Sequence, residues 1–355
     1  MKKNLIFFQS SIELTNIIYL LKKNIYGSSV IIITGGENLL YPIKKINLEK
    51  KYGVKIYNFC SSSLKNPLNI LKMYFRFHLS KDSKSILKYN FDKAYIFSQY
   101  VDFVAPIFLS KCKIKKIYQI MIYEGKNYKR LLEKFAFKDQ KKINLRNKFK
   151  FIILKFLQND KKIKISLQKN KFYTFIHFKV FGKKIKFLQP SLNKITILDL
   201  LSKKNLSKKK IILFIDSDEE KIVGPKYILV TNKILKLASF LNYHIIVKKH
   251  VRENLSKSVN WHTEWDYLVE PLPIELYNLK KVRIVIAMAS AALATIANKY
   301  PKLKCVSTAK LIQNNKSAKQ TIIELNSICS KNRLHYPSNI SEFKKLIRSK
   351  FVHKR

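Results

Sequence analysis

Acidic residues are scarce in this chain. It has 22 Asp and Glu against 71 Lys and Arg in 355 residues, which gives a formal net charge of +49. Such a charge attracts polyanions, namely nucleic acids, anionic membrane surfaces or phosphorylated substrates. The lysines are spread along the whole chain, as a compositional bias of the genome would produce, but that bias does not explain the shortage of acids. The charge alone leaves both interpretations open.

Several motifs with a known chemistry are absent. The four cysteines, Cys60, Cys112, Cys305 and Cys329, lie far apart and form no CxxC pair, which argues against a zinc knuckle or a redox dithiol. Isolated thiols suit a reducing cytoplasm. The sequence contains no GxGxxG, no Walker lysine motif and no GxSxG elbow. The acidic stretch 216–220 lacks the EF-hand pattern, so we expect no metal.

Long hydrophobic runs are also absent. The basic start of the chain is followed by an apolar stretch that is too short for the core of a signal peptide. The most apolar segment, residues 284–297, is too short to span a membrane. We therefore expect a cytoplasmic protein that is either soluble or peripheral on the inner membrane.

Short apolar runs alternate with helical patterns from the first residues onward. Strands are expected at 5–8, 30–34, 55–59, 93–98 and 117–123. A helix is expected at 12–24, capped by Ser10 or Ser11, because Leu14, Ile17, Ile18 and Leu21 share one face. Unbroken apolar strands separated by helices indicate a parallel sheet that is covered on both faces.

A second alternating unit follows a lysine-dense stretch at 139–190, which we interpret as a basic insertion. The best linker candidates are 189–194 and 202–210. Strands are expected at 211–215, 244–247, 282–287 and 303–306, and helices at 231–242, 274–281, 291–300 and 341–349, the last capped by Ser341. The predicted fold is α/β, with two Rossmann-like doubly wound domains at 1–195 and 196–355 and a cleft between them.

Ligands of such sheets bind beyond the carboxyl ends of the strands. Glu124 directly follows an apolar strand and precedes Gly125, so it can face a cleft as a general base. The alternative is an acid in a solvated loop or at a helix start, where the helix dipole favours it.

The stretch "YHIIVKKHVREN", residues 243–254, places a basic cluster after a strand. Lys248, Lys249, His250 and Arg252 can bind phosphate oxygens, and a protonated histidine can donate to a leaving phosphate. In a chain this rich in lysine, a solvated basic loop is the alternative.

Two further stretches offer polar groups near helix starts. Ser290 lies between a strand and a helix that opens with small residues, where free backbone N–H groups favour an anion. Its alternative is an ordinary N-cap serine. Glu275 follows Pro273 at the start of the expected helix 274–281, where it can bind ribose hydroxyls or only complement the helix dipole.

In chain order these are an acid-Gly turn, a strand followed by histidine, a Pro-x-Glu helix and a strand-Ser-helix turn. Together with the opening "NLIFFQSSIELTNIIYLL", this order resembles the bacterial sialyltransferases of glycosyltransferase families 52 and 38, which have a GT-B fold of two Rossmann domains. The chain departs from their motifs at four places. Tyr123 replaces the first acid, Val251 replaces the proline after the histidine, Ser10–Ser11 replaces Thr-Pro, and Ala291 replaces a second hydroxyl residue.

The resemblance implies an inverting, metal-independent transfer of sialic acid from CMP-sialic acid to a cell-surface glycan, either lipooligosaccharide or capsule. It makes Glu124 the general base and gives His250 and Ser290 the task of stabilising the CMP phosphate. Lys249 and Arg252 would add charge, and Glu275 would bind the ribose. No cofactor is implied beyond the CMP-activated donor. An alternative base is one of the acids at the start of the second domain: Asp216, Asp218, Glu219 or Glu220.

Two other functions remain open from the sequence. One is a GT-B transferase that uses another nucleotide sugar. The other is a basic nucleic-acid-binding protein that uses the lysine-aromatic stretch 171–187, although no RRM, KH or helix-turn-helix signature supports it. The expected partners are therefore a nucleotide-sugar donor, a glycan or glycolipid acceptor and the anionic inner-membrane surface, and not nucleic acid.

Overall fold

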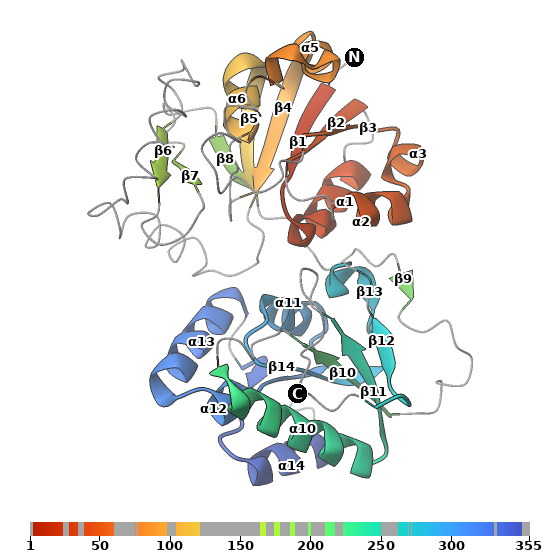
Figure 1. The fold of residues 1–355 in the computed structure, drawn as a ribbon, viewed down its shortest axis with the longest axis vertical. Coiled ribbons are helices and arrows are strands. Elements are labelled where there is room, and N and C mark those ends of the chain that lie inside the picture. The colour runs from red at the N-terminus through yellow and green to blue at the C-terminus, as the bar shows by residue number, and fades with distance from the viewer. Residues whose placement is uncertain are drawn as a thin grey trace. The chain divides into compact units, whose positions relative to one another are not determined.

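The chain forms two compact units in the computed structural model, one from elements before residue 192 and one from elements after it (Figure 1). The structure describes residues 3–23, 28–34, 39–59, 75, 77–97, 104–120, 164–167, 174–177, 185–188, 198–199, 210–216, 223–249, 262–268, 270, 272–329 and 332–349. The predicted boundary at 195–196, the linker 189–194 and most of the stretch 139–190 lie outside these residues. So does the linker 202–210, except Lys210, which begins a strand.

The first unit is built on a parallel sheet with the strand order β3-β2-β1-β4-β5-β8. Its strands are β1 (Lys3–Phe8), β2 (Ser28–Ile33), β3 (Lys55–Asn58), β4 (Asn90–Phe97), β5 (Lys113–Ile120) and β8 (Ile185–Leu188). Its helices are α1 (Leu14–Lys23), α2 (Leu40–Ile46), α3 (Leu48–Tyr52), α5 (Lys81–Leu87) and α6 (Val104–Lys111). Two further strands, β6 (Lys164–Leu167) and β7 (Thr174–His177), pair in antiparallel fashion. The reversal of strand order between β1 and β4 is the arrangement of a Rossmann sheet.

Alternation along β1 supplies both faces of this sheet. Leu5 and Phe7 belong to a cluster with Phe108 of α6 and Ile86 of α5, while Ile6 is equally buried on the other face. The predicted apolar face of α1 is buried, with Leu14, Ile17 and Ile18 fully covered and Leu21 nearly so. Each such side chain contributes about 1.5–3 kcal/mol relative to exposure. The prediction that Ser10 or Ser11 caps α1 is wrong. A 3-10 turn at Ser11–Glu13 precedes the helix, and Ser10, which begins this turn, makes no side-chain capping bond.

The second unit repeats this plan with the order β12-β11-β10-β14-β15-β16, and every pair is parallel. Its strands are β10 (Lys210–Ile215), β11 (Tyr243–Lys248), β12 (Asp266–Leu268), β14 (Val282–Ala287), β15 (Lys304–Ser307) and β16 (Leu334–His335). Its helices are α10 (Pro225–Phe240), α11 (Ala291–Lys299), α12 (Ala309–Ile312), α13 (Asn315–Ile328) and α14 (Ile340–Arg348). The predicted α/β chain with two Rossmann-like doubly wound units is therefore confirmed.

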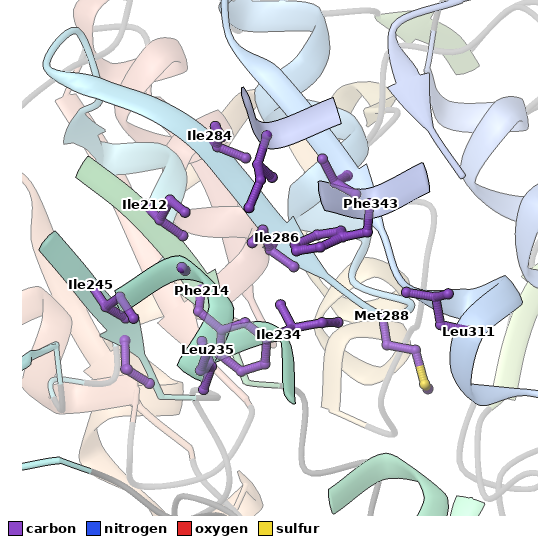
Figure 2. Packing of buried hydrophobic residues seen from close by; sticks show 14 of the residues in the cluster. Ile212, Phe214, Ile234, Leu235, Ile245, Ile284, Ile286, Met288, Leu311 and Phe343 are labelled. Carbon is purple, nitrogen blue, oxygen red and sulfur yellow. The ribbon is translucent and has the colours of Figure 1, made fainter. Parts of the chain in front are cut away.

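The core of the second unit joins the sheet to α10 and α14. Figure 2 shows Ile212, Phe214 and Ile286 of the strands beside Ile234 of α10, with Phe343 of α14 at the same face. Because strand residues alternate between faces, the remaining apolar positions of the same strands are available to α11, which contacts β14 and β15. This double cover explains why the strands read as unbroken apolar runs.

Two expectations about helices were wrong, and a third helix is present with different bounds. The expected helix 274–281 is a 3-10 turn, η5 (Ile274–Leu276), followed by β13 (Tyr277–Asn278), because Tyr277 pairs with Leu198 of β9 (Leu198–Asp199). The last helix is capped by Asn339, whose side chain accepts from the Glu342 N–H, and not by Ser341. The helix expected at 231–242 begins earlier, at Pro225, since proline suits a first helical position.

No helix among the described residues has the length and apolarity that crossing a membrane requires.

Candidate functional site

The carboxyl edge of the second sheet contains the switch in strand order. The chain passes from β10 to β11 on one side of β10 and later to β14 on the other, and Ile215 is in register with both Lys248 and Ala287. The residues that follow these three strand ends are Asp216, Lys249 and Met288. Since neighbouring strands lie about 4.8 Å apart, these residues share one edge. Open α/β sheets bind ligands at such a switch point.

Ser290 stands at the start of α11, at this edge. Its backbone is extended, with φ −74° and ψ 126°, and its carbonyl accepts from the Leu293 N–H at 3.0 Å. Its half-buried hydroxyl makes no capping hydrogen bond to the helix. The hydroxyl and the first N–H groups of a nine-residue helix are thus positioned to bind an anion.

Ser307, at the end of β15, holds the turn that precedes Ser290. Its fully buried hydroxyl donates to the Met288 carbonyl at 2.6 Å and accepts from the Ala309 N–H at 3.3 Å. The Thr308 N–H adds a bond to the Ala287 carbonyl at 3.0 Å. Sequence analysis missed Ser307, because only the pairing of β14 with β15 brings it to this turn.

The two adjacent lysines at the end of β11 differ in their surroundings. Lys248 is 2% exposed, and its ammonium donates to the carbonyls of Lys249 at 2.6 Å and Glu270 at 3.0 Å. Burial lowers the pKa of Lys248 to about 8, an effect that the nearby Glu275 carboxylate partly opposes. Lys249 is half-buried. Lys248 therefore fastens the loop after β12, and Lys249 is the lysine that remains nearer to solvent.

Glu275, in η5, lies under the electrostatic influence of two lysines. It is 8% exposed, and burial raises its pKa, while Lys299 and Lys248 act to lower it. The Lys299 ammonium donates to the Glu275 carbonyl at 2.8 Å, and burial lowers the pKa of Lys299 to about 8. A carboxyl group on which two lysines act electrostatically can accept a hydrogen bond from a ligand hydroxyl.

Asp216 is fully buried at the end of β10. Its Oδ1 accepts from the Tyr227 hydroxyl at 2.5 Å, and its N–H donates to the Lys248 carbonyl at 3.0 Å. These bonds tie the first turn of α10 to two strands. Asp216 thus has the surroundings of a structural carboxylate. Tyr227 was not found from the sequence, because it lies next to no motif and only the packing of α10 on the sheet brings it to Asp216.

Comparisons with known proteins give a weak likeness in structure only. No protein-family model matches the chain, and no curated protein matches it. MnaA of S. aureus, solved with UDP, is 14% identical over 96% of this chain and 94% of its own, with a TM-score of 0.48. UDP-GlcNAc 2-epimerase from Neisseria meningitidis, bound to UDP-GlcNAc, is 15% identical over 98% of both chains, with a TM-score of 0.46. At these values the fold assignment rests on the strand order of the chain itself.

Five of the eleven residues named as candidates for the site lie in the described part of the chain. Asp216, Lys249 and Ser290 lie at the carboxyl edge of the second sheet, and Lys248 connects this edge with Glu275. The other candidates lie outside the described residues: Glu124, His250, Arg252, Asp218, Glu219 and Glu220. Among the described residues, no three or more His, Cys, Asp or Glu side chains group closely enough to hold a metal ion.

Proposed function

We propose that the chain is a glycosyltransferase of the GT-B type that takes its sugar from a nucleotide-activated donor. One observation carries this proposal. At the switch point of the second sheet, Ser290 leaves its hydroxyl out of the helix cap, beside the first N–H groups of α11. That arrangement suits a nucleotide phosphate, and a second Rossmann-like unit in the same chain supplies the other half of a GT-B transferase.

In this proposal the second unit binds the donor. The phosphate next to the sugar lies at the start of α11, where Ser290 donates a hydrogen bond. Lys249 adds positive charge from the end of β11, and Glu275 accepts hydrogen bonds from the ribose hydroxyls. Ser307 acts as a positioning residue, because it fixes the turn before Ser290.

The finer proposal is an inverting transfer from CMP-sialic acid to a surface glycan, and it rests on the order of motifs in the sequence. An acceptor hydroxyl attacks the anomeric carbon and forms the new glycosidic bond while Glu124 takes its proton. The bond from the anomeric carbon to the phosphate oxygen breaks, and its electron pair leaves with CMP. His250, Arg252 and Ser290 stabilise the growing charge on that phosphate. We prefer Glu124 to Asp216 as the base because Asp216 is fully buried and bonded to Tyr227.

Thermal stabilisation by nucleotides tests the donor site. A ligand that binds only the folded chain raises the melting temperature by mass action. We expect CMP to stabilise the chain more than UMP, GMP or ADP, and Ser290→Ala to reduce the shift. A larger rise in melting temperature with UMP or GMP would leave the glycosyltransferase proposal intact and would change the nucleotide that we assign to the donor.

Transfer assays test the reaction. Transfer from CMP-sialic acid to a lipooligosaccharide or capsule acceptor should survive EDTA and be lost in Glu124→Gln and His250→Ala. Vesicles that carry the acceptor in an anionic membrane test whether the lysines place the enzyme at that surface. Salt-sensitive binding of RNA, without binding of any nucleoside monophosphate, would overturn the enzyme proposal.

A further inference from the structure

A second feature of the second unit lies at the amino ends of its parallel strands, where β14 and β15 begin. A pocket of about 430 Å³ opens there between the segments that precede the two strands. It is lined by Leu279, Lys280, Val282, Arg283, Lys299, Tyr300, Pro301, Lys302 and Leu303. Its volume is within the range of about 300–1,000 Å³ that small-ligand pockets occupy.

Two tight turns form the walls of this pocket. In one, the Val282 N–H donates to the Leu279 carbonyl at 3.0 Å; in the other, the Leu303 N–H donates to the Tyr300 carbonyl at 2.9 Å. The Tyr300 hydroxyl joins them, since it accepts from the Leu279 N–H at 3.4 Å and donates to the Tyr277 carbonyl at 3.2 Å. The walls are thus fixed by backbone bonds before any ligand arrives.

The lining is strongly basic at the rim and apolar at the base. Four of the nine lining residues are Lys or Arg, and none of the nine is acidic. Lys280, Arg283 and Lys302 are exposed, whereas Leu279, Val282 and Leu303 are buried. Lys299 adds a fourth charge from the last turn of α11, although its ammonium also donates to the Glu275 carbonyl.

We propose that this pocket binds the phosphate group of a phosphomonoester or phosphodiester. Four cations in one pocket whose lining contains no acidic residue give a local positive potential, and arginine provides a planar pair of donors suited to phosphate oxygens. The apolar base accommodates the carbon part of the ligand. The group can belong to a soluble glycerol phosphate or to a phospholipid head group, because the recognised chemistry is the same.

The donor phosphate and the pocket are assigned to opposite ends of α11, although the pocket adjoins the proposed ribose contact through Lys299, which donates to the Glu275 carbonyl. The donor phosphate is assigned to the first turn of α11, whereas the pocket contains the residues at its end, Lys299 and Tyr300. Failure of glycosyl transfer would leave this proposal intact, and absence of phosphate binding here would leave the transferase intact.

The test compares two matched triple variants of the full chain. Lys280→Gln, Arg283→Gln and Lys302→Gln remove the exposed cations of the pocket. Lys233→Gln, Lys236→Gln and Lys319→Gln remove three exposed lysines from α10 and α13 and give the same net charge. Titration calorimetry with glycerol 1-phosphate measures the soluble ligand, and flotation with phosphatidylglycerol or phosphatidylcholine vesicles measures the lipid source.

We expect saturable binding of glycerol 1-phosphate that weakens about tenfold or more in the pocket variant and stays within about twofold in the control. If the control variant binds phosphatidylglycerol vesicles and the pocket variant does not, the phosphate group belongs to a lipid head group. If neither variant binds the vesicles but the control still binds glycerol 1-phosphate more tightly than the pocket variant, the ligand is soluble. Equal losses in both variants, or no saturable binding by the wild-type chain in either arm, would overturn the proposal. Circular dichroism of both variants checks that they fold.

Discussion

The hydroxyl of Tyr227 donates a 2.5 Å hydrogen bond to Oδ1 of Asp216, a side chain with no exposed surface. Tyr227 is itself 1% exposed, in the first turn of α10. The bond links the longest helix of the second unit to the end of its central strand. It therefore holds one side of the edge that we assign to the nucleotide.

Removing this hydroxyl should destabilise the second unit. Tyr227→Phe deprives a buried carboxylate of a donor, and we expect the free energy of unfolding to fall by about 1–3 kcal/mol. Urea unfolding followed by tryptophan fluorescence measures this, because both tryptophans, Trp261 and Trp265, belong to the second unit. Tyr336→Phe is the control: its hydroxyl reaches Asn326 at an exposed position, where water can replace the partner. A loss in Tyr227→Phe no larger than the control would contradict the prediction.

Ser290 and Asn339 each stand at the start of a nine-residue helix, α11 and α14, but replacing them by alanine should have different effects on stability. Ser290→Ala should change the stability by less than about 0.5 kcal/mol, because Ser290 makes no capping bond. Asn339→Ala should cost about 1 kcal/mol, since its side chain accepts from the Glu342 N–H at 2.8 Å. The same unfolding measurement compares them. A stable Ser290→Ala with weakened nucleotide binding supports a role in ligand binding, whereas equal costs would make Ser290 an ordinary cap.

Ser307 should affect both stability and binding. Ser307→Ala removes the donor to the Met288 carbonyl and the acceptor of the Ala309 N–H, and we expect a loss of about 1–3 kcal/mol. Because the released turn leads to Ser290, the nucleotide affinity should fall as well. Ser327→Ala, which loses only a bond to a carbonyl within its own helix, provides a control that should leave the nucleotide affinity unchanged. Unchanged affinity in Ser307→Ala would remove its positioning role.

Because Lys248 is buried, the free energy of unfolding should depend on pH. The unfolded chain keeps this proton up to about its ordinary pKa of 10.5, whereas the folded chain loses it near 8. Between these values the unfolded state binds more protons, so the contribution of Lys248 to stability rises with pH, and below 8 the cost of burying the ammonium is present in full. The stability of wild type relative to Lys248→Met should therefore rise by about 1–3 kcal/mol from pH 7 to pH 10. A difference that stays constant with pH would show that the ammonium is not desolvated.

Much of the fold could be predicted from periodicity. β14 occupies the predicted residues 282–287, β10 begins one residue earlier than expected, and β11 is longer by one residue at each end. Buried parallel strands are continuous apolar runs, which makes them recognisable. Residues 274–281 could not be predicted, since local propensity favours a helix there while β13 is formed by pairing with the distant β9.

The candidate site was predictable only in its outline. The position of Ser290 after a strand indicated its place at the sheet edge, and the structure puts it there. The sequence could not tell which of Lys248 and Lys249 is buried, because they are adjacent at the end of the same strand and their difference depends on Glu270 and Glu275. Tyr227 and Ser307 were missed because their partners, Asp216 and Met288, lie just beyond the ends of other elements, β10 and β14.

Helix α11 has different groups at its two ends. Ser290 begins it, and Lys299 in its last turn donates to the carbonyl of Glu275 while it also lines the basic pocket. One lysine is therefore shared by the proposed ribose contact and the proposed phosphate pocket. Thermodynamic linkage requires that any factor by which a phosphate in the pocket changes nucleotide affinity is also the factor by which the nucleotide changes phosphate affinity. Lys299→Met would remove the shared ammonium group, so the factor by which each ligand changes the affinity for the other should approach one.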